Sequence, residues 1–156
     1  MENANVEPGP GIEVNRRAPA YGVAEEFISA PIESVWRILS DLENWPSWNK
    51  GVSKIRVNGP IVPGTSFVWT ANGSKITSRL EEVEPPRRIA WSGRMPGIRA
   101  THVWELRAEG AGTRVRTEES FEGIVAGIFR GIMTKTLVKA INQGTASLKA
   151  VAESQA

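Results

Sequence analysis

The chain has 156 residues, of which 40% are hydrophobic and 23% are charged, and this suits one domain with a substantial core. Its net charge is only +2 and its basic residues are scattered, which argues against a nucleic-acid-binding surface, because such surfaces need clustered Lys and Arg. The absence of cysteine excludes disulfides, thiolate metal sites and cysteine nucleophiles, and it is compatible with the cytoplasmic location that we expect. No apolar run approaches the roughly 18 residues that span a membrane, so we expect no stable membrane insertion.

The N-terminal residues differ in composition from the rest of the chain. Residues 1–20 are polar, rich in Pro and Gly, and lack the apolar centre of a signal peptide. We therefore expect a disordered tail over residues 1–20, followed by a single domain over residues 21–153. The sequence contains no internal repeat, and nothing in it indicates a second domain.

The domain is predicted to begin with a strand over residues 21–29, followed by two short helices. Pro31 suits the first position of the first helix, which ends before Pro46 because the residue preceding a proline disfavours helical backbone. Apolar residues recur on one face of this helix at helical spacing, namely Ile32, Val35, Trp36 and Leu39. The segment 41–51 then forms a second short helix or a compact turn.

Six further strands, separated by turn residues, are predicted between residues 52 and 121. Asn72-Gly73 is the strongest short hairpin signal in the chain, and Gly110-Ala111 indicates another tight hairpin. Successive hairpins make an antiparallel sheet. The expected strands are 52–57, 65–71, 75–83, 88–93, 100–108 and 113–121.

After Gly123 the apolar spacing changes to that of a long helix that runs to about Glu153. Residues at intervals of three and four form one face of it: Phe129, Met133, Leu137, Ile141, Gly144, Leu148 and Val151. Several glycines leave the start of this helix open, since glycine weakens a helix interior. The apolar face of the sheet must be covered, and this helix is the one element long enough to cover it. We therefore predict an α+β fold, in which a curved antiparallel sheet of about seven strands wraps around a long C-terminal helix and leaves a cavity between them.

Several short motifs follow one another along the chain. They are Ala30-Pro31, Val35-Trp36, Asp41, Trp45-Pro46-Ser47-Trp48, Gly64, the segment EPPRRIAW at 84–91, and Gly112-Thr113-Arg114. In this order they resemble the polyketide cyclase/dehydrase-type proteins of the START-like (SRPBCC) superfamily. The resemblance covers about Val23 to Glu153 and implies the helix-grip fold, in agreement with the element order above. It implies no single activity, because the superfamily includes lipid carriers, ligand sensors, stress-response proteins and a few cyclases.

The last predicted hairpin places the only histidine of the chain beside a carboxylate. Along 113–121 the apolar residues alternate with polar ones, and this alternation puts Glu119 on the inner face. With a two-residue turn in this hairpin, His102 lies opposite Glu119, with Cβ atoms about 5 Å apart. The same register sets Glu105 beside Arg116 on the outer face, a favourable pair that supports it. A register two residues longer would separate His102 from Glu119.

The predicted pair of His102 and Glu119 has two interpretations. A carboxylate beside an imidazole raises the pKa of the histidine and fixes its tautomer, so in an apolar cavity the pair could polarise a carbonyl or move a proton as catalytic acid and base. Alternatively, the two groups satisfy each other and close one end of the core, because structural ion pairs produce similar arrangements.

Other residues are predicted to line the cavity and contact a ligand. On the strands these are Phe67, Trp69, Ile76, Trp91, Trp104 and Thr117, and on the long helix they are Phe129, Met133 and Leu137. Tryptophans can line an apolar pocket and stack on flat ligands, or they can be plain core. A structural role is expected for Trp36, Trp45 and Trp48.

The sequence carries no further catalytic signature. One histidine and scattered carboxylates do not make a metal site, and no nucleophile elbow, phosphate loop or dinucleotide fingerprint occurs, so neither a metal nor a cofactor is expected. We expect binding, for carriage or sensing, of a small to medium hydrophobic molecule such as a lipid, an aromatic or a polyketide-like compound. The first alternative is a polyketide cyclase or dehydratase that uses His102 and Glu119 as acid and base. The second is a stress-response or interaction domain with a filled cavity. Nothing in the residue pattern sets an oligomeric state.

Overall fold

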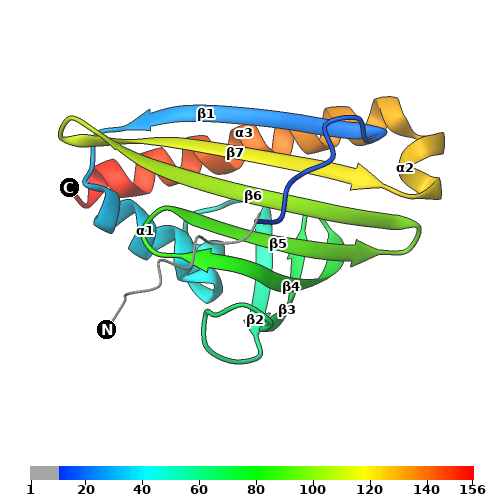
Figure 1. Ribbon diagram of the computed structural model, residues 1–156, viewed down its shortest axis with the longest axis horizontal. Helices are drawn as coiled ribbons and strands as arrows, with labels where there is room; N and C mark the ends of the chain where they lie inside the picture. The colour runs from blue at the N-terminus through cyan, green and yellow to red at the C-terminus, as the bar shows by residue number, and fades with distance from the viewer. Residues whose placement is uncertain (1–10) are drawn as a thin grey trace, which may run out of the picture.

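The computed structural model describes residues 11–156 and has the predicted order of one strand, two short helices, six strands and a C-terminal helical segment (Figure 1). The strands are β1 (Ala20–Ile28), β2 (Val52–Val57), β3 (Ser66–Ala71), β4 (Ser74–Glu84), β5 (Arg88–Met95), β6 (Ile98–Glu109) and β7 (Gly112–Glu122). The helices are α1 (Ile32–Ser40), the 3-10 helix η1 (Leu42–Ser47), α2 (Ile124–Ile128) and α3 (Arg130–Ser154).

The seven strands form one antiparallel sheet in the order β1-β7-β6-β5-β4-β3-β2. Strands β2 to β7 follow one another as hairpins, and β1 joins the sheet beside β7. The β6–β7 hairpin has Glu109 opposite Gly112, so its turn consists of two residues, as predicted. Gly110 in this turn has a φ of +59°, a conformation that glycine adopts without steric cost. The α+β fold with a curved antiparallel sheet and a long C-terminal helix is confirmed.

The segment before β1 packs on the outer face of the sheet, where Figure 1 shows it crossing the strands. Val14 is buried there between side chains of β5 and β6. The backbone N–H of Asn15 donates a hydrogen bond to the Ser120 hydroxyl oxygen at 3.2 Å. The expectation of a disordered tail over residues 1–20 therefore does not apply to residues 11–20. These residues are ordered because the outer face of the sheet carries small apolar side chains that Val14 covers. Residues 1–10 lie outside the described residues.

The C-terminal helical segment is divided into two helices rather than one. Phe129 separates α2 from α3, and its backbone (φ −106°, ψ 32°) leaves the helical region. Helix α3 packs along β1 and β7 on the inner side of the sheet (Figure 1). The contact is close at Gly22 of β1, where a Cβ atom would lie only 2.6 Å from Leu137 Cδ2.

The main core lies between the inner face of the sheet, α1, η1 and the C-terminal half of α3. Trp45 of η1 stands at its centre. Its Nε1–H donates to the Leu39 carbonyl oxygen at 2.8 Å, and its ring centroid lies 5.3–6.3 Å from those of four other tryptophans, namely Trp48, Trp69, Trp91 and Trp104. Trp45 thereby anchors η1 over the sheet. Within residues 11–156 no helix is both long enough and apolar enough to cross a membrane.

Candidate functional site

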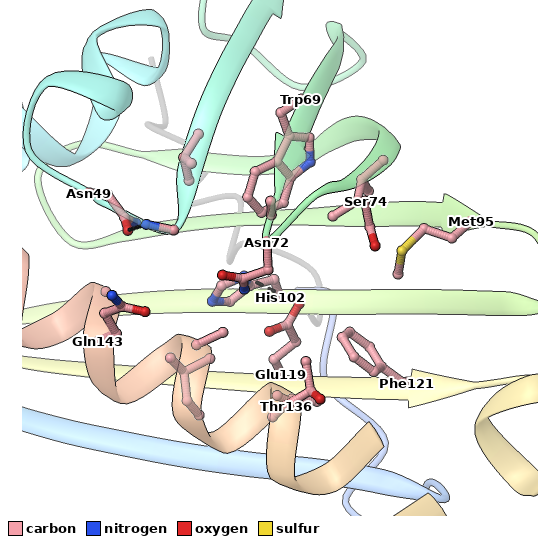
Figure 2. Close-up of a pocket in the computed structure, with 18 of the residues that line it drawn as sticks. Asn49, Trp69, Asn72, Ser74, Met95, His102, Glu119, Phe121, Thr136 and Gln143 are labelled. Carbon is pink, nitrogen blue, oxygen red and sulfur yellow. Dashed lines mark hydrogen bonds and ion pairs between the residues drawn. The ribbon is translucent and has the colours of Figure 1, made fainter. Parts of the chain in front are cut away.

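A cavity of about 180 Å³ lies between the inner face of the sheet and α3. Its wall is mostly apolar, and Figure 2 shows His102 of β6 and Glu119 of β7 beside each other on it. Asn72, Ser74 and Thr136 are exposed residues of the lining, so they mark the mouth between the β3–β4 turn and α3. The cavity thus has an apolar interior, one polar pair on its wall and a polar mouth.

The structure brings seven of the predicted site residues to this cavity. They are His102, Glu119, Trp69, Ile76, Trp104, Met133 and Leu137. The strand residues among them share the inner face because side chains alternate along a strand. The helix residues Met133 and Leu137 are four positions apart and therefore lie on one side of α3.

Four predicted ligand-binding residues do not line the cavity. Phe67 and Trp91 lie on the inner face but are fully covered in the core, with ring centroids 5.7 Å apart, next to Trp45 of η1. Thr117 is fully buried, and its hydroxyl is used by its neighbours in the sheet. Phe129 is half exposed, because the break between α2 and α3 turns it away from the sheet.

Five polar residues of the lining are not predicted by the sequence pattern. They are Asn49, Asn72, Ser74, Thr136 and Gln143, and Figure 2 shows them around the cavity. Thr136 lies three residues after Met133 on α3, and Gln143 lies three residues after Ala140. Residues three positions apart lie on the same side of a helix, so polar residues at this spacing from the apolar face would have indicated both. Asn72 was recognised only as a turn residue.

The hairpin register places His102 directly opposite Glu119, as predicted. Their side chains approach to 3.6 Å between His102 Nδ1 and Glu119 Oε1, and both residues are more than 90% buried. The outer-face neighbours Glu105 and Arg116 are also opposite each other, although Glu105 forms its ion pair with Arg88 instead. The two-residue turn therefore determines which groups meet on the cavity wall.

The hydrogen bonds around His102 assign its tautomer. The Thr117 hydroxyl donates its single proton to the Val103 carbonyl oxygen at 3.0 Å. Thr117 Oγ1 must then accept from His102 Nε2, which lies 2.8 Å away, so Nε2 carries the proton. The lone pair of Nδ1 is left facing Glu119, and this buried atom has no hydrogen-bond partner among residues 11–156.

Burial sets the protonation states of the pair. The loss of solvation lowers the pKa of His102 to about 3 and raises the pKa of Glu119 to about 8. At pH 7 the pair therefore consists of a neutral imidazole and a neutral carboxylic acid. The expectation that the carboxylate raises the histidine pKa is wrong, because Glu119 is itself protonated and the cost of burying an imidazolium dominates.

A neutral pair of this kind offers a ligand two complementary groups. The protonated Glu119 can donate a hydrogen bond to a carbonyl or ether oxygen, and His102 Nδ1 can accept one from a hydroxyl. Trp104, on the same wall, has a buried Nε1–H without a partner among the described residues. No group of three or more His, Cys, Asp or Glu side chains suited to a metal ion occurs within residues 11–156.

Comparison with known proteins agrees with this architecture. The START superfamily protein from Mycobacterium smegmatis is similar in structure, with a TM-score of 0.73 and 12% identity, over 87% of this chain and 99% of that one. The Zhui aromatase/cyclase from Streptomyces sp. R1128 matches with a TM-score of 0.68 and 15% identity, over 86% and 92%. A hypothetical protein from Helicobacter pylori, jhp0584, matches with a TM-score of 0.78 and 19% identity, over 86% and 89%.

At the level of sequence, no curated protein matches the chain significantly. The profile of the family described as "Polyketide cyclase / dehydrase and lipid transport" matches residues 22–153, which is most of the chain. The chain therefore belongs to the polyketide cyclase/dehydrase and lipid transport family and has the START-like helix-grip fold.

Proposed function

We propose that the protein binds a small, mainly apolar molecule that carries an oxygen function. One observation supports this most directly: an apolar cavity between sheet and helix has a neutral His102–Glu119 pair on its wall. Hydrophobic surface provides affinity in such a cavity, and a few polar groups orient the ligand. Family membership adds support, since the family description includes lipid transport.

The size of the cavity limits the ligand. An apolar protein cavity of about 150 Å³ accommodates benzene, and this one holds about 180 Å³. The enclosed part of the ligand is therefore about the size of a small aromatic ring system or a short branched chain. A longer lipid or polyketide-like molecule would extend through the mouth beside Asn72 and Thr136.

The low basicity of His102 favours binding over catalysis. A general base works best when its pKa is near the working pH, whereas the pKa of His102 is lowered to about 3 by burial. Glu119, with its pKa raised to about 8, is protonated and is suited to hydrogen bonding or acid catalysis. The pair therefore recognises oxygen more readily than it abstracts protons.

Thermal unfolding with naphthalene, 2-naphthol and 2-acetylnaphthalene tests the proposal. A ligand at about 100 times its dissociation constant adds about 2.7 kcal/mol of stability, which corresponds to roughly 5–10 °C in a domain of this size. We expect both oxygen-bearing compounds to bind about tenfold more tightly than naphthalene, because each gains a hydrogen bond in a dry site.

A cavity-filling variant provides the matched control. Gly144 lines the cavity, and a Cβ there would have ordinary contacts, 3.6 Å from Asn49 Nδ2 and 3.8 Å from Trp104. Gly144→Leu should remain folded and lose the thermal shift, while Gly144→Ala should keep it. Equal shifts in Gly144→Leu and the natural protein would show that the compounds bind elsewhere, and no shift with any compound would contradict the proposal.

A second candidate function is a dehydratase or cyclase, which the opposite proton preferences of His102 and Glu119 favour. In a dehydration, Nδ1 of His102 would take the α-proton of a β-hydroxy carbonyl compound while Glu119 protonates the departing hydroxyl, which leaves as water. The proton then returns from His102 to Glu119 across 3.6 Å. Turnover of a β-hydroxy ketone that is lost in both His102→Ala and Glu119→Gln would support this function. The remaining alternative, a domain with a filled interior, is disfavoured by the cavity itself.

A further inference from the structure

Four large apolar side chains are exposed together where α2 meets α3. Their exposed fractions run from 50% for Phe129 and 63% for Ile132 to 69% for Ile128 and 78% for Ile124. We call these four residues the apolar end patch. Single exposed apolar residues are ordinary, but a cluster on consecutive helical turns marks a surface that is covered in use.

The apolar end patch adjoins the turn between β5 and β6. The N–H of Val125 donates to the Gly97 carbonyl oxygen at 3.1 Å, which fastens α2 to this turn. Figure 1 shows α2, the start of α3 and the β5–β6 turn at the same end of the molecule. Arg94 and Arg99 flank the turn and lie directly opposite each other. Like charges in that position repel, so a negatively charged partner would stabilise them.

The charge around the apolar end patch is positive. Arg94, Arg99, Arg130 and Lys135 are exposed, and within residues 11–156 none of these four forms an ion pair. The chain has no Asp or Glu between Gly123 and Ala152 or between Pro85 and Trp104. Glu122 lies opposite Arg99 in the β6–β7 ladder, and it accepts a hydrogen bond from Asn15.

We propose that the apolar end patch docks on the surface of an anionic lipid bilayer. Isoleucine and phenylalanine side chains enter the boundary between headgroups and acyl chains, while surrounding Arg and Lys contact anionic headgroups. A second copy of the chain is a poorer occupant. A twofold contact through the patch would bring the same four cations of both copies together, with Glu122 of each copy as only a partial balance.

Docking in this orientation also brings part of the cavity wall close to the bilayer. Met133, which lines the cavity, follows Ile132 of the patch directly in α3. Met95 and Ile98 also line the cavity, and they lie between Arg94 and Arg99. The same end of the molecule thus combines apolar anchors, cations and part of the cavity wall.

Vesicle flotation tests the proposal with the full chain. We expect binding to phosphatidylcholine vesicles that contain about 30% phosphatidylserine, weak binding to pure phosphatidylcholine, and a loss of binding in high salt. Ile128→Ser/Ile132→Ser should abolish flotation. Arg99→Gln/Arg130→Gln should lower the affinity for these vesicles about 25-fold, because each cation near the membrane surface contributes a factor of about five.

Matched variants elsewhere separate docking from general surface effects. Val62→Ser and Lys54→Gln change exposed apolar and cationic residues away from the patch, and they should leave flotation unchanged. All substituted side chains are exposed, so the fold is expected to be retained, and circular dichroism checks it. Flotation that persists in Ile128→Ser/Ile132→Ser, or no binding to anionic vesicles, would overturn the proposal. A concentration-dependent dimer that the same double variant abolishes would assign the patch to self-association instead.

Discussion

Replacing Glu119 by glutamine should change how the stability of the protein depends on pH. The pKa of this group is about 8 in the folded state and 4.5 as an ordinary carboxyl, so the folded protein holds a proton that the unfolded chain releases between these values. Its stabilising contribution is complete below pH 4.5 and is lost as the pH rises through 8. The amide of the Glu119→Gln variant cannot titrate, yet it resembles the protonated acid and keeps an N–H to donate to His102 Nδ1.

The magnitude follows from these two pKa values. Between pH 6 and pH 8.5 the free energy of unfolding should fall by about 2.5 kcal/mol through Glu119, at 1.36 kcal/mol per pH unit until the folded group itself ionises. His102 stabilises the folded protein at high pH, where Glu119 does not. Because its pKa is lowered to about 3, its stabilising contribution is complete above pH 6.5 and is lost only as the pH falls toward 3. Between pH 6 and pH 8.5 His102 therefore adds about 0.8 kcal/mol, a change that the natural protein and the variant share.

Denaturant titrations of both proteins at pH 6 and pH 8.5 make the measurement. At each pH the free energy of unfolding of the natural protein is subtracted from that of the variant. The change in this difference between the two pH values isolates Glu119, because the other titrating groups are common to both proteins. We expect Glu119→Gln to be favoured over the natural protein by about 2 kcal/mol at pH 6, which is about 1.5 pH units above the ordinary carboxyl pKa of 4.5, and by about 2.5 kcal/mol more at pH 8.5. A difference that is the same at both pH values would refute the reasoning, since it would mean that Glu119 is already ionised in the folded state.

Two other substitutions test the packing around the site. Thr117→Val should destabilise the protein by about 1–3 kcal/mol, because it leaves His102 Nε2–H and the Val103 carbonyl without this partner in a dry environment, and Thr117→Ser should recover most of the loss in a denaturant titration. Unchanged stability in Thr117→Val would contradict the hydrogen bonds assigned to Thr117. Gly22→Ala should cost about 1–3 kcal/mol through the 2.6 Å approach to Leu137, whereas Gly131→Ala, with nothing within 4 Å, should stabilise by up to about 1 kcal/mol in the same titration. Equal effects at the two glycines would show that α3 does not press on β1 there.

Local patterns were sufficient to predict the sheet and the His102–Glu119 pair. Strand alternation and the turn glycines are properties of adjacent residues, and a two-residue turn leaves one register for the β6–β7 hairpin. The apolar spacing of Leu137, Ile141, Gly144 and Leu148 likewise determines which side of α3 faces the sheet, since all four are buried. These predictions required no knowledge of how distant segments pack.

The tertiary structure decided what local patterns do not contain. Whether an inner-face residue meets the cavity depends on how it packs in the core. Trp91 is buried between Trp45 and Phe67, whereas Trp69 and Trp104 lie on the cavity wall. The break at Phe129 turns that side chain outward, although its spacing matches the buried face of the helix. The protonation of His102 and Glu119 also depends on burial, because desolvation reversed the pKa change that their proximity alone would produce. The sequence thus determined which two groups face each other, and the enclosing layers determined that both are neutral.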